Sequence, residues 1–446
     1  MEITLQDILT ARENRVKKQR ELLKKYQKPL ICFTLNIAGP AKCDPHIIRG
    51  FTLGKRWLEI QLKDLSVLHR ESLTLPTGCE GYYVVDAPAE ELKLRTVQIE
   101  DSAPVARLFD MDVIDTGGQK LERTALGFSE RKCLLCHKPA YVCSRSRAHS
   151  VKDLQAQTHR LLLDAEKQEI CEKIAEIAQK SILFEVCTTP KPGLVDLRNS
   201  GSHKDMDIFT FMSSAASLYP YFYRCAMIGA ENRNLTPKQV FSLLRFPGKV
   251  AKNAMYRATN GVNTHKGIIF SLGILCAAAG YVSGKPYQPE QILQISKNMT
   301  QGIVKKELSS ANGDSHGEKL YSRYGITGVR GQAEQGFPAV LQMGLPVLEK
   351  GLQTGLSLND AGIAALLSLL TITQDTNLIH RCSLEEQQKL CREIGTLLSR
   401  HPYPNREILE QLDDRFIDKN LSPGGCADLL ALSYFLYFLS QTEVIP

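Results

Sequence analysis

Two aspartates separated by one residue are the most concentrated acidic feature in the first half of the chain. Asp110 and Asp112 lie in the run FDMDVID, whose alternating apolar residues predict a β-strand. Because side chains alternate across a strand, both carboxylates are expected on one face. Such a pair suits Mg²⁺ or Mn²⁺ that also binds substrate phosphates, and Arg107 could bind a phosphate nearby. The pattern predicts phosphoryl or nucleotidyl transfer, with surface acids at a strand end as the simpler alternative.

A basic, cysteine-rich segment follows at residues 131–152. It contains six lysines and arginines and no acidic residue. Arg145 and Arg147 are therefore candidates to bind phosphates or an acidic protein partner, although a solvated basic surface would look the same. Three cysteines of this segment could hold structural zinc with a nearby histidine: Cys133, Cys136 and Cys143. A second CxxC pair is missing, so we favour reduced thiols in a tight turn over zinc.

Four polar blocks interrupt the apolar second half. The first, KPGLVDLRNSGSHKDMD, combines a turn with cations, an imidazole and acids: Lys191, Gly193, His203, Lys204, Asp205 and Asp207. The second, GVNTHKG, stands directly before a long apolar segment, where Thr264 or Asn263 is expected to cap the first helical turn. Free backbone N–H groups at such a helix start, with Lys266 and Gly267 beside them, form an anion site that suits a triphosphate. His265 is either a further capping side chain or a functional group.

The third and fourth blocks carry arginines, glycines and one further acid. Arg323 and Arg330 stand among glycines in SRYGITGVRG, where the backbone can approach a phosphate closely. Ordinary loop glycines are the alternative. Asp375 lies in TQDTN, and Gly424 and Gly425 lie in SPGGCADLL at the start of another helical segment. The blocks together predict a polyphosphate site in the second half.

The elements that must position these residues differ between the two halves. Before about residue 150, β-type runs between glycines and prolines predict an α+β fold: PLICFTLNI, GYYVVDAP, TVQIED and DMDVID. Residues 150–187 read as one continuous helix, and the later segments GIIFSLGILCAAAGY, LNDAGIAALLSLLTI and ADLLALSYFLYFL are also helical. Single cores stop growing near roughly 250 to 300 residues. We therefore expect a multi-domain protein with an N-terminal α+β domain (1–165) followed by an all-α helical domain (166–446).

The motifs of both halves resemble two families that serve citrate lyase. ARLFDMDVID and RKCLLCHKPAYVCSRSRAHSVKDL, with QKPLICFTLNIAGPAK near the start, resemble the phosphoribosyl-dephospho-CoA transferase that converts apo citrate lyase to its holo form. KPGLVD, SHKDMD, NTHKG, GVRG and GGCADLLA, in this order, resemble the triphosphoribosyl-dephospho-CoA synthase family. Cys426 stands where a serine or another small residue is expected.

The resemblance implies two consecutive reactions. In the second half, the 2′-hydroxyl of 3′-dephospho-CoA attacks the ribose C1 of ATP, and adenine leaves. In the first half, a serine of the acyl carrier subunit of citrate lyase attacks the α-phosphate of that product, and pyrophosphate leaves. Asp110 and Asp112 would then hold Mg²⁺.

The synthase chemistry needs phosphate-binding cations, acids for Mg²⁺ or base catalysis, and a group that transfers protons. The phosphate-binding candidates are Lys191, Lys204, Lys266, Arg323 and Arg330. The acids are Asp205, Asp207 and Asp375, and either His203 or His265 transfers the proton.

Other functions fit the sequence less well. Neither GxxxxGK[ST] nor GxGxxG occurs in a strand–turn–helix context, which argues against a P-loop kinase or a dinucleotide oxidoreductase. An assembly chaperone that binds the acyl carrier subunit without catalysis stays as the alternative. Basicity without interleaved aromatic residues does not indicate a nucleic-acid partner. We expect no export signal and no membrane segment, hence a cytoplasmic protein with reduced cysteines.

Overall fold

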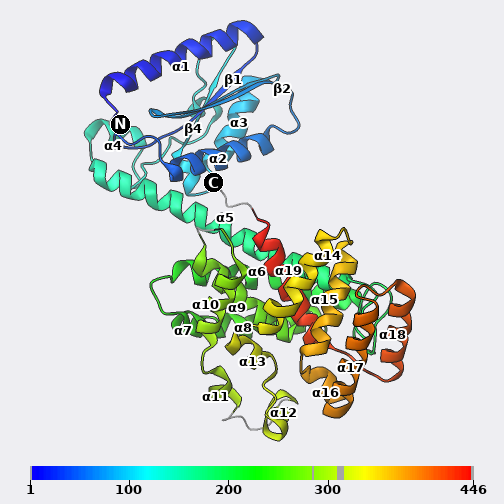
Figure 1. Ribbon diagram of the computed structural model, residues 1–446. Helices are drawn as coiled ribbons and strands as arrows, with labels where there is room; N and C mark the ends of the chain where they lie inside the picture. Colours follow the sequence, from blue (N-terminus) through cyan, green and yellow to red (C-terminus); the bar gives the residue numbers. More distant parts are fainter. Residues whose placement is uncertain (1–2, 284–285, 309–315, 443–446) are drawn as a thin grey trace. The chain divides into compact units, whose positions relative to one another are not determined.

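The computed structural model describes residues 3–283, 286–308 and 316–442. The chain divides after Gln168 into two compact units, named unit 1 up to Gln168 and unit 2 from Glu169. The division falls within one long helix, α5 (Val151–Cys187), in the helical stretch expected from the sequence (Figure 1). Among the described residues, every helix is too short or too polar to span a bilayer.

Unit 1 is built on an antiparallel four-stranded sheet with the strand order β2-β3-β1-β4 (Figure 1). The strands are β1 (Leu30–Leu35), β2 (Val67–Leu75), β3 (Gly78–Val85) and β4 (Phe109–Ile114). The helical elements are α1 (Leu5–Tyr26), α2 (Pro45–Gln61), α3 (Ala89–Glu100), η1 (Val105–Leu108), η2 (Arg123–Leu126), α4 (Ala140–Ser146) and the first part of α5. Unit 1 therefore has the α+β composition that the sequence predicted.

Helices cover both faces of this sheet. On one face, Phe33, Met111 and Val113 pack against the apolar sides of α2 and α3. On the other face, α1 contributes Leu22 and Leu23, which pack on alternate residues of the same strands. Asp110 pairs with Thr34 and Asp112 with Cys32 between β4 and β1. Since Met111 faces the α2–α3 core, the two carboxylates share the opposite face, as alternation requires.

Two strand assignments in unit 1 differ from the sequence expectation. The run TVQIED was predicted as a strand but forms the end of α3, because its buried residues continue a stripe at helical spacing that begins upstream, at Ala89, Leu92 and Lys93. The strand β2 was missed. Its residues alternate only between intermediate and exposed positions, so an edge strand of this polarity carries a weak apolar signal.

The described residues of unit 2 form helices joined by loops and no strand, in agreement with the all-α expectation. After the second part of α5 its helices are α6 (Ile208–Glu231), α7 (Pro237–Leu243), α8 (Arg245–Ala258), α9 (Lys266–Val282), α10 (Pro289–Thr300), α11 (Ile303–Leu308), α12 (His316–Tyr324), α13 (Gly328–Gln335), η3 (Val340–Gly344), α14 (Leu345–Gln353), α15 (Leu358–Ile372), α16 (Thr376–Arg381), α17 (Leu384–Arg400), α18 (Arg406–Asp418) and α19 (Gly424–Ser440).

The most apolar helices of unit 2 form its core. α9, α15 and α19 coincide with the three apolar segments predicted as helices, and most of their residues are buried. α6 and α9 cross with their backbones in contact, since a Cβ added at Gly229 would lie 2.0 Å from the carbonyl oxygen of Ala277. A Cβ added at Gly280 would likewise lie 2.1 Å from the carbonyl oxygen of Ala226. These contacts hold the C-terminal parts of α6 and α9 together.

The loop between α5 and α6 is anchored to a buried carboxylate of α18. Asp413 is fully buried, accepts hydrogen bonds from Gly193 N (2.9 Å) and Asn199 Nδ2 (2.8 Å), and forms an ion pair with Arg198. Gly193 adopts a left-handed conformation (φ +72°), and a Cβ there would lie 2.1 Å from the carbonyl oxygen of Leu421. Gly193, predicted to bind substrate, therefore has a structural reason to be glycine.

We expect Asp413→Ala to destabilise unit 2 by roughly 3 kcal/mol, because it leaves a guanidinium and two further donors without their buried acceptor. The midpoint of urea unfolding followed by helical circular dichroism should fall. Trp57, the single tryptophan of the sequence, belongs to unit 1 and packs on Phe109 at 5.7 Å between ring centroids. Its fluorescence transition is the internal control. A lower unfolding midpoint by Trp57 fluorescence, with an unchanged midpoint by circular dichroism, would contradict the assignment of Asp413 to the stability of unit 2.

Candidate functional site

A cavity of about 1130 Å³ lies within unit 2 and gathers residues from most of the polar blocks. The predicted residues that line it are Lys191, His203, Asn263, Thr264, His265, Lys266, Gly267, Arg330, Asp375, Gly424 and Gly425. The walls come from the α5–α6 loop and from the starts of α9, α13, α16 and α19. Segments that are up to about 240 residues apart in sequence therefore meet in one cavity.

Five residues predicted for the site of the second half do not line this cavity: Gly193, Lys204, Asp205, Asp207 and Arg323. Asp207 caps α6, since its Oδ1 accepts hydrogen bonds from the backbone N (2.9 Å) and Oγ1 (2.7 Å) of Thr210. These hydrogen bonds also lower the pKa of Asp207. Lys204 and Asp205 are exposed, and the guanidinium of Arg323 lies 5.0 Å from the centroid of the Tyr324 ring. Charged residues cluster in these stretches of sequence, but the clustering alone did not show which of them line the cavity.

The start of α9 places a buried histidine in the cavity wall. His265 is the N-cap residue but makes no capping hydrogen bond, so neither Thr264 nor Asn263 caps the helix as predicted. Instead, Thr264 Oγ1 donates to Ser214 Oγ (2.8 Å), and Ser214 Oγ lies 2.7 Å from His265 Nδ1. Ser214 Oγ accepts from Thr264, and the tautomer that also gives the Ser214 hydrogen an acceptor has this hydrogen on the Nδ1 side and the ring hydrogen on Nε2.

His265 is therefore a neutral hydrogen-bond donor. Burial, reinforced by the positive charge of Lys191, lowers the pKa of His265 to about 3. Its Nε2 is buried and has no hydrogen-bond partner within the described residues. A buried N–H without a partner costs free energy that a bound ligand can recover. Of the two histidines proposed for the site, His265 has the unused nitrogen.

His203 is held at both ring nitrogens. Its Nε2 lies 2.9 Å from Ser422 Oγ, and Arg381 Nη2 lies 3.3 Å from its Nδ1. Burial and the charge of Arg381 lower the pKa of His203, so the ring is neutral near pH 7. Taking up a proton would place two positive charges, on His203 and Arg381, within hydrogen-bonding distance, so His203 is less suited than His265 to bind a ligand through a ring nitrogen.

Three carboxylates that line the cavity are electrostatically coupled. Glu185 forms an ion pair with the buried Lys191 and also accepts its hydrogen bond at the backbone oxygen (2.7 Å). Asp375 accepts from the backbone nitrogens of Asn377 (2.9 Å) and Cys426 (2.8 Å), which joins α16 to α19. Asp428 has no such partner within the described residues. Burial raises the pKa of Asp428 well above its usual range, and the nearby Glu185 and Asp375 raise it further.

Asp428 lies against the start of α9. A Cβ added at Gly267 would lie 1.9 Å from Asp428 Oδ2, so only a glycine lets the carboxylate approach this helix terminus. Neither Glu185 nor Asp428 was assigned a role from the sequence. Glu185 lies in a helical stretch with several other charged residues, so no signal in the sequence marked it. The signal available for Asp428 was that it is the single acid in the apolar stretch ADLLALSYFLYFL.

A basic stripe on α8 was also missed. Arg245, Lys249 and Lys252 occur at i, i+4 and i+7, which puts them on one side of the helix, and all three line the cavity. Arg245 and Arg330 both form ion pairs with Glu307. Lys249 and Lys266 form no ion pair in the part of the chain that the structure describes. The spacing of these basic residues was the signal that could have identified the stripe.

The carboxylate pair of unit 1 is already accompanied by cations. Asp110 Oδ1 lies 3.3 Å from Arg131 Nη1, and Asp112 Oδ1 lies 2.6 Å from Lys120 Nζ. Burial and repulsion from Asp112 raise the pKa of Asp110, whereas Arg131 opposes that shift. The second oxygen of each carboxylate takes no hydrogen bond from the described residues. These two oxygens are the atoms that fit a divalent cation accompanied by substrate phosphates.

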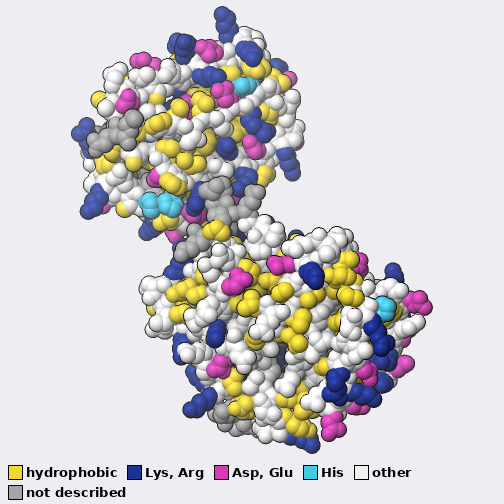
Figure 2. All heavy atoms as spheres, viewed as in Figure 1, with side chains coloured by type: hydrophobic (Ala, Val, Ile, Leu, Met, Phe, Trp, Pro, Cys, Tyr) yellow, Lys and Arg dark blue, Asp and Glu magenta, His cyan; other side chains and the backbone are white. Residues whose placement is uncertain are grey.

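The other basic candidates of unit 1 have separate places. Arg107 donates through Nη2 to the backbone oxygens of Lys132 (3.3 Å) and Cys133, so it holds the cysteine-rich segment. Arg145 and Arg147 are exposed at the end of α4. On the face seen in Figure 2, basic side chains are interspersed with acidic and apolar ones on both units. That face has no continuous basic surface of the kind that binds a nucleic-acid backbone.

Comparison with known proteins gives consistent matches for both units. A family model described as ATP:dephospho-CoA triphosphoribosyl transferase matches residues 171–445, and one described as Apo-citrate lyase phosphoribosyl-dephospho-CoA transferase matches residues 3–165. The chain is 35% identical to Protein CitXG of Haemophilus influenzae, over 98% of this chain and 96% of that protein. It is 35% identical to Protein CitXG of Leuconostoc mesenteroides subsp. cremoris, over 97% of each. It is 39% identical to the 2-(5''-triphosphoribosyl)-3'-dephosphocoenzyme-A synthase of Klebsiella pneumoniae, over 62% of this chain and 93% of that protein.

Proposed function

We propose that this chain, which belongs to the ATP:dephospho-CoA triphosphoribosyl transferase family, is a bifunctional transferase that catalyses first the synthase reaction and then the prosthetic-group transfer. The chain carries in addition a region that matches the apo-citrate lyase transferase family. The synthase domain comprises residues 166–446 and the prosthetic-group transferase domain residues 1–165. The matched ranges, 171–445 and 3–165, support this division.

The synthase reaction takes place in the cavity of unit 2. The bond from adenine N9 to the ribose C1 of ATP breaks, and the 2′-oxygen of 3′-dephospho-CoA forms the new bond to C1. The 2′-hydroxyl gives its proton to water, Asp428 gives one to adenine and regains it from water, and the triphosphate stays on the product. The observation that carries this proposal is one cavity that holds a basic wall on α8, the α9 terminus with Lys266, and a carboxyl group, Asp428, whose pKa burial raises well above its usual range.

Each wall of the cavity has a distinct role. Lys249, Lys252 and Lys266 bind the triphosphate, because exposed cations and free backbone N–H groups favour a polyanion there. Asp428 gives its proton to adenine as the sugar–base bond breaks. The Nε2–H of His265 donates a hydrogen bond to the bound nucleotide, which satisfies the buried ring nitrogen.

Mg²⁺ would enter this cavity as a complex with ATP. Glu185, Glu307 and Asp375 line the cavity, but Lys191, two arginines and backbone N–H groups already occupy them. Mg²⁺ commonly keeps several waters and binds through one or two carboxylates and substrate phosphates. We infer that the triphosphate is its principal ligand, where it neutralises charge, and that Asp205 and Asp207 do not bind it.

The transferase reaction takes place on the α1 face of the unit 1 sheet. The serine hydroxyl of the citrate lyase acyl carrier subunit forms a phosphodiester with the α-phosphorus, and the bond to pyrophosphate breaks. Asp110 and Asp112 would hold Mg²⁺, which would supply positive charge for the departing pyrophosphate. The exposed Arg145 and Arg147 contact the carrier subunit or its incoming phosphates.

The two-step function is tested directly with apo acyl carrier subunit, ATP and 3′-dephospho-CoA. We expect adenine in solution and a carrier subunit whose mass increases by the phosphoribosyl-dephospho-CoA group. An assembly chaperone for the carrier subunit, the alternative considered from the sequence, would release no adenine and leave the carrier mass unchanged.

Replacing Lys266 by Ala separates the two activities. A charge-assisted hydrogen bond is worth about 1.5–3 kcal/mol, so kcat/KM for adenine release should fall roughly 10- to 100-fold. Transfer from preformed triphosphoribosyl-dephospho-CoA should stay unchanged. Lys238→Ala is the matched control, since this lysine is exposed on α7 and does not line the cavity. A comparable fall in the transfer step in folded protein would refute the division of labour between the units.

A further inference from the structure

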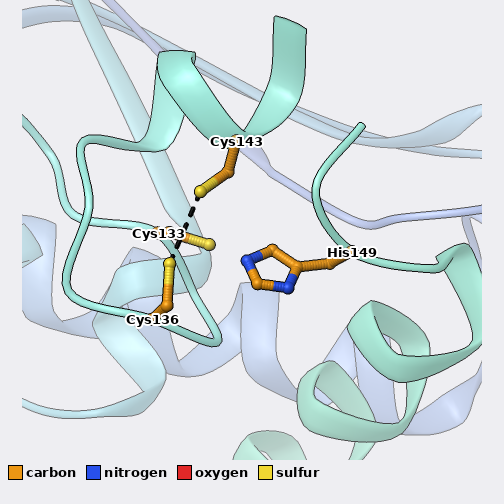
Figure 3. Close-up of side chains that lie close together, drawn as sticks. All are labelled: Cys133, Cys136, Cys143 and His149. Carbon is orange, nitrogen blue, oxygen red and sulfur yellow. Dashed lines mark hydrogen bonds between the residues drawn. The ribbon is translucent and has the colours of Figure 1, made fainter. Parts of the chain in front are cut away.

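Three cysteines and one histidine of unit 1 converge on a single point (Figure 3). One ligand atom from each of Cys133, Cys136, Cys143 and His149 lies within 4.8 Å of every other. The sulfurs of Cys136 and Cys143 are 3.4 Å apart, which is far from the disulfide bond length of about 2.05 Å. Two sulfurs on a tetrahedral zinc with bonds of about 2.3 Å are roughly 3.8 Å apart. The spacing excludes a disulfide and is close to that of two sulfurs on one metal ion, and it also lies within the range of a thiol hydrogen bond.

The backbone of this segment is shaped to bring the four side chains together. Cys133 N donates to Lys138 O (2.8 Å) and Ala140 N to Arg131 O (2.7 Å), which closes a tight turn around the CLLC sequence. The helix α4 then supplies Cys143. Arg147, in a left-handed conformation (φ +49°), ends α4 and turns the chain so that His149 faces the thiols.

A buried atom of His149 points to a ligand. Its Nε2 is buried and has no hydrogen-bond partner within the described residues. An unsatisfied buried ring nitrogen costs about 1–3 kcal/mol. A metal ion at the centre of the four side chains would satisfy the histidine and the three sulfurs at once.

The segment lacks a hydrophobic core that could replace a metal. Between residues 115 and 150, Cys133 and Cys143 are the buried side chains. Stretches that bury so little apolar surface are usually held by disulfides or a metal ion. The cysteines of this segment are free thiols, so a metal ion could fasten the segment in addition to the hydrogen bonds from Arg107.

We propose that Cys133, Cys136, Cys143 and His149 bind one structural Zn²⁺. Four protein ligands of the Cys₃His type close the coordination sphere, which is characteristic of structural and not catalytic zinc. The sequence analysis disfavoured zinc because a second CxxC pair is missing. The structure removes that objection, because α4 contributes the third thiol and the following turn contributes His149.

The zinc-bound segment carries a residue of the transferase site. Arg107 donates to the backbone oxygens of Lys132 and Cys133, and Arg131 donates to Asp110 Oδ1 (3.3 Å) and to the backbone oxygen of Phe109. Zinc therefore fixes the segment whose Arg131 meets the carboxylate pair. This consequence rests on the proposed transferase function, whereas the zinc site itself does not.

Zinc content of the full-length protein, purified without chelators, is the test. We expect one zinc per chain by elemental analysis and by native mass spectrometry. Cys136→Ser and His149→Ala should lose most of it, and His149→Cys should keep it as a Cys₄ site. Cys187→Ser, which changes a half-buried cysteine in α5 outside the cluster, should keep the full zinc content.

Cobalt substitution covers the case in which a variant does not fold. Wild-type protein reconstituted with Co²⁺ should show the visible bands of a tetrahedral ion and near-ultraviolet thiolate charge transfer. A Cys136–Cys143 disulfide, or wild-type protein that contains no zinc and gives no tetrahedral cobalt spectrum, would overturn the proposal. Zinc-loaded protein that fails to transfer the prosthetic group would count against the proposed function and leave the zinc site standing.

Discussion

Asp428→Asn should reduce adenine release about 10²- to 10⁴-fold, the usual contribution of a general acid. Asparagine keeps the shape of the side chain, so the close contact with Gly267 is preserved and only the transferable proton is lost. The measurement is the rate of adenine formation from ATP and 3′-dephospho-CoA at saturating Mg²⁺. Transfer from preformed donor should be unaffected.

The pH profile adds a second readout for Asp428. Burial and two neighbouring carboxylates raise its pKa, so Asp428 keeps its proton to a higher pH than an ordinary aspartate and loses it as pH rises through the raised pKa. Wild-type kcat should therefore fall on the alkaline side, and Asp428→Asn should lose that limb of the profile.

Two control variants delimit the role of Asp428. Asp418→Asn changes an exposed acid at the end of α18 and should leave the rate unchanged. Asp205→Asn, which the sequence alone ranks above Asp428, should change it far less than Asp428→Asn does. If excess Mg²⁺ restores the Asp428→Asn rate, Asp428 is a metal ligand and the assignment as proton donor is wrong.

Asp110→Asn should produce the complementary defect. Removing one electrostatic stabiliser of a developing charge usually costs about 10²- to 10³-fold in rate, so transfer to the acyl carrier subunit should fall by that amount while adenine release continues. The Mg²⁺ concentration needed for half-maximal transfer should rise, because one of the two proposed metal ligands becomes neutral. Triphosphoribosyl-dephospho-CoA should accumulate in the coupled assay.

The control for Asp110 is Asp86→Asn, which removes one partner of an exposed ion pair with Lys28 in the same unit. Such pairs contribute little to stability, and this variant should retain both activities. Trp57 fluorescence reports whether unit 1 of the Asp110 variant is folded. Equal loss of both reactions in folded Asp110→Asn protein would argue against separate sites.

Local patterns in the sequence were sufficient for several conclusions. Alternation along FDMDVID fixed the shared face of Asp110 and Asp112, and long apolar runs identified α9, α15 and α19. The family and the bifunctional transferase function inferred from the ordered motifs are confirmed by the matches to both families. The individual site residues stay predictions. The strand and helix assignments depend on short stretches of consecutive residues, whereas the family was inferred from the order of motifs along the chain.

Other features were decided by tertiary contacts. Asp428 became a candidate because Glu185 and Asp375, from distant helices, lie near it and raise its pKa. Thr264 was expected to cap α9, but Ser214 of α6 offered it another partner. Likewise, His149 completes a zinc site only because α4 and the turn after it bring it to the thiols. Spacing along a helix or strand determines which side chains share a face, whereas helix packing determines which faces meet and which buried groups lack a partner.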